Sequence, residues 1–248
     1  MSIEEVSTNF SGTNSSLATR VAEERAAYER RRKEREEAHL YMSIQVASEA
    51  NFKMYQGFDI VPWKDDTDSP ARPKQYRVLR ATTMSQFCEM VANDLEVEAD
   101  MIRPWAMVNR QNGTARPDVP ITFPDMTVEE AANKFGTKTT SFRLWIEKAD
   151  TRDGEGNALF GDKLLDLKAH QNNRPLMLFL KHFDAKTQSL FGVGNFYAAL
   201  QDKVCDVSPQ ILKLLGWPAG TNFKLHEVGS LVKFPFNAAD NDRKLNKT

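Results

Sequence analysis

The chain has 248 residues, and its charges nearly cancel, since 33 lysines and arginines against 34 aspartates and glutamates leave a formal net charge of −1. This balance excludes a general electrostatic attraction to nucleic acid or to a membrane surface, and we expect neither as a partner. Two cysteines and four scattered histidines cannot build a disulfide framework or a zinc site. We therefore expect a reducing compartment and no metal or cofactor.

We expect no export signal at the N-terminus. It lacks the cationic start and the apolar core of a leader, and no stretch of the chain reaches the roughly 18 apolar residues that a membrane span requires. We expect a soluble intracellular protein, located in the nucleus and cytoplasm. At this length we predict two domains, because domains typically run about 100 to 150 residues.

The chain begins with a polar tail and a charged helix. Residues 1–16 are rich in Ser, Thr, Asn and Gly, and we expect them to be disordered. Residues 17–38 form a connector helix of good helix formers, with opposite charges four residues apart in Arg25/Glu29, Glu29/Lys33, Arg30/Glu34 and Arg32/Glu36. Its basic cluster, residues 30–33, is either a nuclear-import or phosphate-binding patch or a solvated salt-bridged face. The interleaved glutamates favour the solvated face.

The first domain, residues 39–149, opens with strict apolar alternation, the period-two pattern of a half-buried strand. The residues of its apolar face are Leu40, Met42, Ile44 and Val46. We expect a polar hairpin loop over 51–74 and a short strand at 76–78. The third strand, 102–108, contains Pro104, which cannot donate a ladder hydrogen bond, so this strand should be an edge or bulged.

Capping boxes predict two helices in this domain. Thr83 with Gln86 begins one, and Thr127 with Glu130 begins a shorter one that Gly136 ends. The first helix carries the apolar face Met84, Phe87, Cys88, Val91 and Leu95. Asn112-Gly113 forms a turn, and residues 142–147 form the closing strand. Strand, strand, helix, strand, short helix, strand is the order of a ubiquitin-like β-grasp, an α+β fold.

Residues 150–173 read as a polar, glycine-bearing linker, after which the pattern restarts in a second domain, residues 174–248. The expected elements are a central strand at 175–183 buried on both faces, a turn at 184–187, a partner strand at 190–200 with a bulge at Gly192 and Gly194, a helix from Ser208 and Pro209 to Gly216, and a strand at 222–228. We find no final strand with apolar alternation after Phe236. We therefore expect this second domain to be incomplete, with its first strand unpaired on one side.

No catalytic motif emerges from the thiols and imidazoles. Cys88 lies on an apolar helix face, where burial raises a thiol pKa, and Asp206 beside Cys205 disfavours its thiolate. The histidines, at positions 39, 170, 182 and 226, share no local motif with either cysteine. The glycines at 154, 156, 192 and 194 do not precede a helix as a phosphate cradle does.

Three tryptophans, Trp105, Trp145 and Trp217, are candidates for contact with a partner. Trp145 is the strongest, because it alternates away from the face that carries Leu144. Packing against the linker or the neighbouring domain is an equal alternative for these rings.

The segment KEREEAHLYM is similar to the one that joins the catalytic domain to the first ubiquitin-like domain in ubiquitin-specific proteases of the herpesvirus-associated type. Four later segments resemble that family in the same order: IRPWAM, NGTARP, LMLFLK and DAKTQSL. The five occupy residues 33–42, 102–107, 112–117, 176–181 and 184–190. The resemblance covers the chain from about Glu23 to Val228.

The resemblance implies the connector helix and tandem ubiquitin-like region of a deubiquitinating cysteine protease, without its catalytic machinery. In such enzymes the helix joins the catalytic domain, and the second ubiquitin-like domain presents an acidic surface to lysine-containing segments of substrates and regulators. Glu227 keeps one acidic position, so Glu227 and Trp145 are the partner-binding residues that we predict. The alternatives are a thiol hydrolase in its own right and a scaffold that dimerises through the helix, which lacks a coiled-coil heptad.

Overall fold

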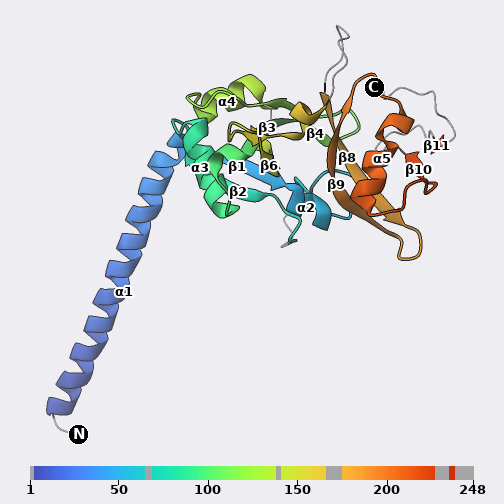
Figure 1. The fold of residues 1–248 in the computed structure, drawn as a ribbon. Helices are drawn as coiled ribbons and strands as arrows, with labels where there is room; N and C mark the ends of the chain where they lie inside the picture. The colour runs from blue at the N-terminus through green and yellow to red at the C-terminus, as the bar shows by residue number, and fades with distance from the viewer. Residues whose placement is uncertain (1–2, 65–68, 138–140, 166–174, 227–234, 238–248) are drawn as a thin grey trace. The chain divides into compact units, whose positions relative to one another are not determined.

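The computed structural model describes residues 3–64, 69–137, 141–165, 175–226 and 235–237. It is a mixed α+β protein, as predicted, and the chain divides into two compact units, Met1–Met42 and Ser43–Thr248. Figure 1 shows the elements in chain order.

The first unit is a long charged helix. Helix α1 runs from Ile3 to Glu37, so residues 3–16, which we expected to be disordered, are helical. Each residue added to a nucleated helix gains one hydrogen bond, which lets the strong helix formers of the second half extend it toward the N-terminus. Of the predicted charge pairs, Arg32 Nε bonds Glu36 Oε1 at 2.9 Å. The cluster at 30–33 is exposed, as a solvated face requires.

A five-stranded sheet forms the centre of the second unit. Its strands are β1 (Tyr41–Ser48), β2 (Lys74–Leu79), β3 (Ile102–Asn109), β4 (Ala115–Pro120) and β5 (Phe142–Lys148), in the order β2-β1-β5-β3-β4. The last strand lies in the middle, parallel to the first, with Ile44 opposite Phe142. Strand β3 is antiparallel to both β5 and β4.

Both predicted capping boxes are confirmed. Thr83 Oγ1 accepts from the Gln86 backbone N–H at the start of α3 (Met84–Asp94), and Thr127 Oγ1 accepts from that of Glu130 at the start of α4 (Val128–Phe135). Helix α3 packs on the sheet through buried residues, and the Phe87 ring meets the Tyr76 ring of β2 edge-on at 5.5 Å.

The expectation that β3 is an edge strand is wrong, because β3 lies between β5 and β4. The alternative of a bulge is confirmed, since the β3–β4 register shifts between Ala106 and Met107. The Pro104 carbonyl oxygen accepts from the Ile121 backbone N–H at 2.8 Å, just beyond β4, so the missing N–H removes only the reciprocal bond at the end of that ladder. The edge strand β4 carries Pro117 and Pro120, which discourage further strand pairing.

The other face of the sheet is covered by residues that we expected to form a polar hairpin loop. A short helix, α2 (Glu49–Met54), has Ser48 as its N-cap. The Ser48 backbone N–H donates to Asn51 Oδ1 at 3.0 Å. One buried cluster joins this segment to the sheet: Ala47, Phe52, Ile60, Val61, Trp63, Met107, Ala115 and Trp145. The apolar residues of 52–63 have no regular spacing, so periodicity did not reveal them.

The segment expected as a linker is partly structured. Strands β6 (Thr151–Arg152) and β7 (Ala158–Leu159) pair antiparallel, and a 3₁₀ turn, η3 (Gly161–Leu164), follows. Ala158 and Phe160 are buried with Ala149 and contact Met101. Residues 166–173 lie outside the described part of the chain.

A second, smaller layer follows. Strands β8 (Pro175–Asp184) and β9 (Ser189–Ala199) pair antiparallel, and the predicted bulge lies where Lys181 faces Gly192 and Leu180 faces Gly194. Alternate residues of β8 point to opposite faces, with Leu178 and Leu180 toward α5 (Val204–Leu215). On the other face, Met177 and Phe179 contact the cluster on the first sheet. Among the described residues, β8 pairs with β9 alone.

Helix α5 begins earlier than predicted, at Val204 rather than at Ser208. Asp206 accepts a hydrogen bond from the Lys203 backbone N–H at 2.8 Å, which caps the helix one turn ahead of the Ser-Pro pair. Gly216 ends it in the left-handed region, φ 66°, as predicted. Strand β10 (Lys224–His226) then pairs with β11 (Pro235–Asn237).

The two bulge glycines are expected to respond differently to a methyl group. A Cβ at Gly192 would lie 2.3 Å from the carbonyl oxygen of Phe52, whereas at Gly194 the nearest atoms are Glu49 Oε1 at 3.3 Å and a Leu214 methyl at 3.6 Å. We expect Gly192→Ala to lower the free energy of unfolding by about 1–3 kcal/mol in urea denaturation. Gly194→Ala, the matched control, should cost less than about 1 kcal/mol; equal losses would show that α2 does not approach β9 as described.

Candidate functional site

The two thiols lie in different surroundings. Burial, assisted by the charge of Glu89, raises the pKa of the half-buried Cys88 thiol to about 11, so the thiolate is rare at neutral pH. Cys205 is exposed at the start of α5, with Asp206 Oδ1 3.7 Å from its sulfur. Within the described ranges, no group of three or more His, Cys, Asp or Glu side chains could hold a metal ion. No helix in those ranges is long and apolar enough to cross a membrane.

The histidines have structural or surface positions. The ring of His182 packs edge-on against Phe191 at 5.2 Å and Trp217 at 5.4 Å. His39 and His226 are exposed, and His170 lies outside the described residues.

The structure buries Trp145, one of the two predicted partner-binding residues. Its exposed fraction is 0%, and its ring meets the Phe179 ring of β8 at 4.8 Å and the Phe52 ring of α2 at 6.4 Å. Trp145 does point away from the Leu144 face, but that outer face is covered by the chain itself. Of the two alternatives for this ring, the structure therefore supports packing against the neighbouring segment and corrects the partner contact.

The remaining candidates are only partly accessible or not described. Trp105 is half-buried and donates a hydrogen bond to Glu147, and Trp217 is half-buried against His182. Glu227, the second predicted partner-binding residue, lies outside the described residues.

Glu147 is the centre of a polar junction between the sheet and β9. Its carboxylate is only 5% exposed, yet both oxygens are bonded. Oε2 accepts from Trp105 Nε1 at 2.7 Å and from Arg103 Nε at 2.9 Å, and Oε1 accepts from the Tyr197 hydroxyl at 2.7 Å. A buried carboxylate is tolerated only when it is paired and hydrogen-bonded, and this one is.

Arg103 extends the junction to the segment before β8. Its guanidinium makes a two-point contact with Asp162 at 2.8 and 3.0 Å and lies 4.3 Å above the Phe160 ring. Burial alone would lower its pKa, but the carboxylates of Asp162 and Glu147 outweigh burial and raise the pKa of Arg103. Burial and the Glu147 carboxylate also raise the pKa of the Tyr197 phenol. Arg103 therefore keeps its charge, and Tyr197 keeps its proton, across the neutral range.

A second contact across the junction involves Lys181 of β8. Its ammonium donates to the Gly57 carbonyl oxygen at 2.6 Å and to the Tyr55 carbonyl oxygen at 3.4 Å. The rings of Phe52 and Tyr55 lie 5.0 and 4.8 Å from the nitrogen. Together with the Glu147 network, this contact holds the second layer in one fixed position on the first sheet.

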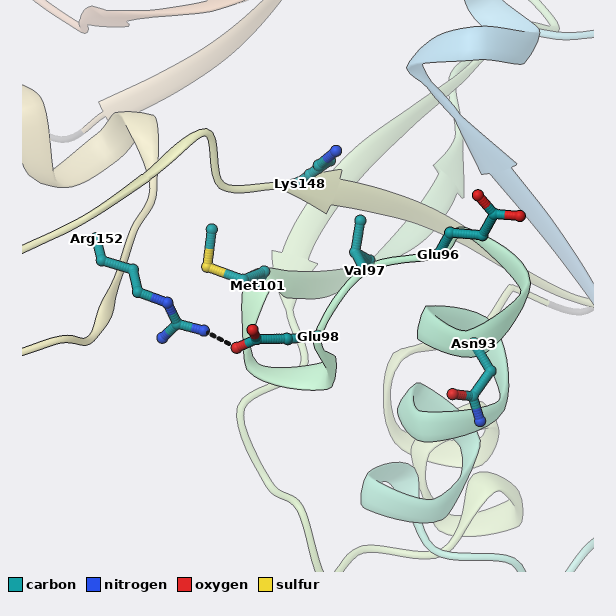
Figure 2. Close-up of a pocket in the computed structure, with 7 residues that line it drawn as sticks. All are labelled: Asn93, Glu96, Val97, Glu98, Met101, Lys148 and Arg152. Atoms are coloured by element: carbon teal, nitrogen blue, oxygen red, sulfur yellow. Dashed lines mark hydrogen bonds and ion pairs between the residues drawn. The ribbon is translucent and has the colours of Figure 1, made fainter.

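A surface pocket of about 490 Å³ opens beside the C-terminal end of α3. Figure 2 shows its seven lining residues: Asn93, Glu96, Val97, Glu98, Met101, Lys148 and Arg152. Arg152 reaches across to Glu98 and also bonds Asp100, so its charge is already neutralised. The walls of the pocket carry both signs of charge, from Glu96 and Glu98 and from Lys148 and Arg152.

Sequence reasoning missed the junction because its members are far apart in the chain. Glu147 was visible only as an outward position of a strand, and Tyr197, its partner, lies 50 residues later. One signal was available in the sequence. Trp145 and Glu147 lie on the outward face of the strand, and a solvent-exposed face would usually carry small polar side chains in place of a tryptophan.

The fold and the site define a mixed α+β region in which buried polar groups join two layers. A family profile, the ICP0-binding domain of ubiquitin-specific protease 7, matches residues 102–233, over half of the chain. The chain belongs to this family.

Curated relatives agree with this assignment. The chain is 27% identical to ubiquitin carboxyl-terminal hydrolase 5 of Schizosaccharomyces pombe over 80% of its own length and 17% of the relative's. It is 28% identical to hydrolase 15 of the same yeast, over 83% and 17%, and 26% identical to ubiquitin C-terminal hydrolase 12 of Arabidopsis thaliana, over 85% and 18%. The chain thus spans about a sixth of the length of these relatives, and the matches support a non-catalytic domain of a deubiquitinating enzyme.

Removing one of two tyrosine hydroxyls tests how much the junction stabilises the fold. Tyr197→Phe removes a bond to the buried Glu147, and Tyr76→Phe removes a 2.6 Å bond to the exposed Asp94. We expect Tyr197→Phe to lower the free energy of unfolding by about 1.5–3 kcal/mol, because a buried carboxylate oxygen loses its partner. Tyr76→Phe should cost about 1 kcal/mol or less, since water replaces the hydroxyl. Chemical denaturation measures both, and an equal cost would contradict the buried junction.

The thiols should differ in reactivity. Because the thiolate is the nucleophile, we expect iodoacetamide near neutral pH to modify Cys205 at least about tenfold faster than Cys88. Peptide mass spectrometry gives both rates, and the urea-unfolded chain, in which both thiols should react alike, is the control. A faster reaction at Cys88 would reopen the thiol-hydrolase alternative.

Proposed function

We propose that this chain is the connector helix and tandem ubiquitin-like region of a deubiquitinating cysteine protease, and that it recruits substrates and regulators through their lysine-containing segments. The connector helix joins the region to the catalytic domain of the parent enzyme, which acts in the nucleus and cytoplasm. The chain itself has no catalytic role in this proposal.

One observation carries the proposal: the family match at residues 102–233 runs from β3 through the second layer. The matched unit therefore includes both sides of the junction and not the sheet alone. A binding function suits such a unit, because the buried junction fixes the surfaces of the two layers relative to each other, and preorganised surfaces lose less entropy when they bind.

The topology supports two ubiquitin-like domains. In the first sheet, the parallel pairing of β1 with β5 in the middle is the arrangement that a β-grasp requires. In the second layer, β8, β9 and α5 repeat the opening order of strand, strand and helix. The order of the described elements is thus compatible with a tandem repeat.

Lysine recognition has a simple physical basis. An ammonium group makes charge-assisted hydrogen bonds with carboxylates, and the acidic position that follows β10 is Glu227. In this proposal Glu227 accepts from the lysine of a bound segment.

The test is an amide-resolved NMR titration of the full chain with a lysine-rich peptide. We expect the signals of Lys224–His226 to shift, and Glu227→Gln to weaken binding by up to about fivefold, since an exposed charge pair is worth about 0.2–1 kcal/mol. Glu89→Gln on α3 is the control and should change nothing.

Specificity for lysine is tested with a second peptide in which glutamine replaces each lysine, and this peptide should not bind. Equal binding of both peptides, or no effect of Glu227→Gln, would contradict lysine recognition at this position. Dispersed signals without any shift would contradict the recruitment function of this chain while leaving its family membership intact.

A further inference from the structure

Glu96 has a backbone conformation that glutamate rarely adopts. Its φ is 55°, in the left-handed region, directly after the last turn of α3. The Val97 backbone N–H donates to the Ala92 carbonyl oxygen at 3.0 Å, and a helix that ends with such a bond usually has glycine in the left-handed position. Helix α5 ends in the same way and has Gly216 there. Local structure therefore favours glycine at position 96, and glutamate lowers the stability of this helix end.

The side chain of Glu96 lines the surface pocket beside α3. The volume of this pocket, about 490 Å³, falls within the range of about 300–1,000 Å³ that is typical of ligand sites. Figure 2 shows the apolar side chains of Val97 and Met101 between Glu96 and Arg152. In the described part of the chain, neither the Glu96 carboxylate nor the ammonium of Lys148, at the end of β5, forms an ion pair or a hydrogen bond.

The other charges at the pocket satisfy one another. The Arg152 guanidinium bonds the carboxylates of both Glu98 and Asp100, so this group of three retains one negative charge. With Glu96 and Lys148 included, three carboxylates stand against two cations, and the pocket favours a bound cation. Glu96 is then the carboxylate that is available to a bound cation, and Lys148 is the ammonium that is available to a bound anion.

We propose that this pocket binds a peptide segment of a partner protein that carries a lysine and, close to it, an acidic residue. The lysine ammonium donates to Glu96, its aliphatic stem covers Val97 and Met101, and the acidic side chain accepts from Lys148. The inference rests on the proposed function for the class of partner, a lysine-containing segment. It adds a contact on the first layer to the one proposed for Glu227. A binding role gives glutamate a reason to replace glycine at a strained position.

The experiment is an NMR titration of the full chain that follows the methyl signals of Val97 and Met101. The probe is the blocked peptide acetyl-Gly-Lys-Ala-Glu-Gly-amide, and the control peptide has glutamine in place of its lysine and glutamate. We expect the two methyl signals to shift with the probe and not with the control. No shift with the probe, or equal shifts with both peptides, overturns the proposal.

The signals of Lys224–His226 separate this inference from the proposed function. Shifts at Lys224–His226 without shifts at Val97 and Met101 overturn the pocket and leave recognition at Glu227 standing. Shifts at Val97 and Met101 that persist in the Glu227→Gln chain support the pocket as a separate contact.

Substitutions of Glu96 separate binding from structure. Glu96→Gly removes the carboxylate and relieves the backbone, so we expect the melting temperature to rise by about 2–4 °C while the affinity falls about two- to fivefold. Glu96→Gln should weaken binding equally without raising the melting temperature. Glu89→Gln, on an exposed position of the same helix outside the pocket, should change neither. A Glu96→Gly chain that binds the probe as tightly as the unsubstituted chain overturns the proposal.

Lys148→Gln tests the second charge. We expect it to weaken binding of the probe about two- to fivefold, because the acidic side chain of the peptide loses its partner. A peptide that keeps the lysine but has glutamine in place of the glutamate should bind both chains alike. Equal binding of the original probe to the Lys148→Gln and unsubstituted chains overturns the assignment of Lys148.

Discussion

The second compact unit depends on the burial of one carboxylate. Glu147 lies on the outer face of the first sheet, where an unpaired charge would cost several kcal/mol. Arg103, Trp105 and Tyr197 together satisfy it, and they come from two different layers. The same hydrogen bonds that stabilise the charge therefore fix the position of β9 on the sheet. Apolar contacts are less directional than hydrogen bonds and would fix this position less closely.

Apolar contacts between the two layers add to the hydrogen bonds of Glu147. The Phe179 ring fits edge-on between Trp145 and Phe52, and Gly192 lets the end of α2 approach β9 closely. As a result the sheet is covered on both faces, by α3 on one and by α2 with the second layer on the other.

Much of the local structure could be predicted from the sequence. The capping boxes at Thr83 and Thr127, the bulge opposite Lys181 and the helix end at Gly216 all follow from interactions within a few residues. Predictions failed where a distant segment decided the outcome. The loop at 51–74 contains a helix because its apolar residues have a sheet face to cover, and β3 is internal despite Pro104 because β4 begins to pair just beyond it.

By itself the sequence determined the fold class, four strands and two helices of the first layer, and the family. Strand β4 and helix α2 were not predicted. Charge spacing, capping residues and apolar period act between neighbours in the chain, so they can be recognised without a structure. Only the tertiary structure decided that Trp145 is buried and that Glu147 and Lys181 join two layers. The contacts of these side chains are with residues far away in the chain. A local sequence pattern does not show which distant segment will cover a given face of a strand.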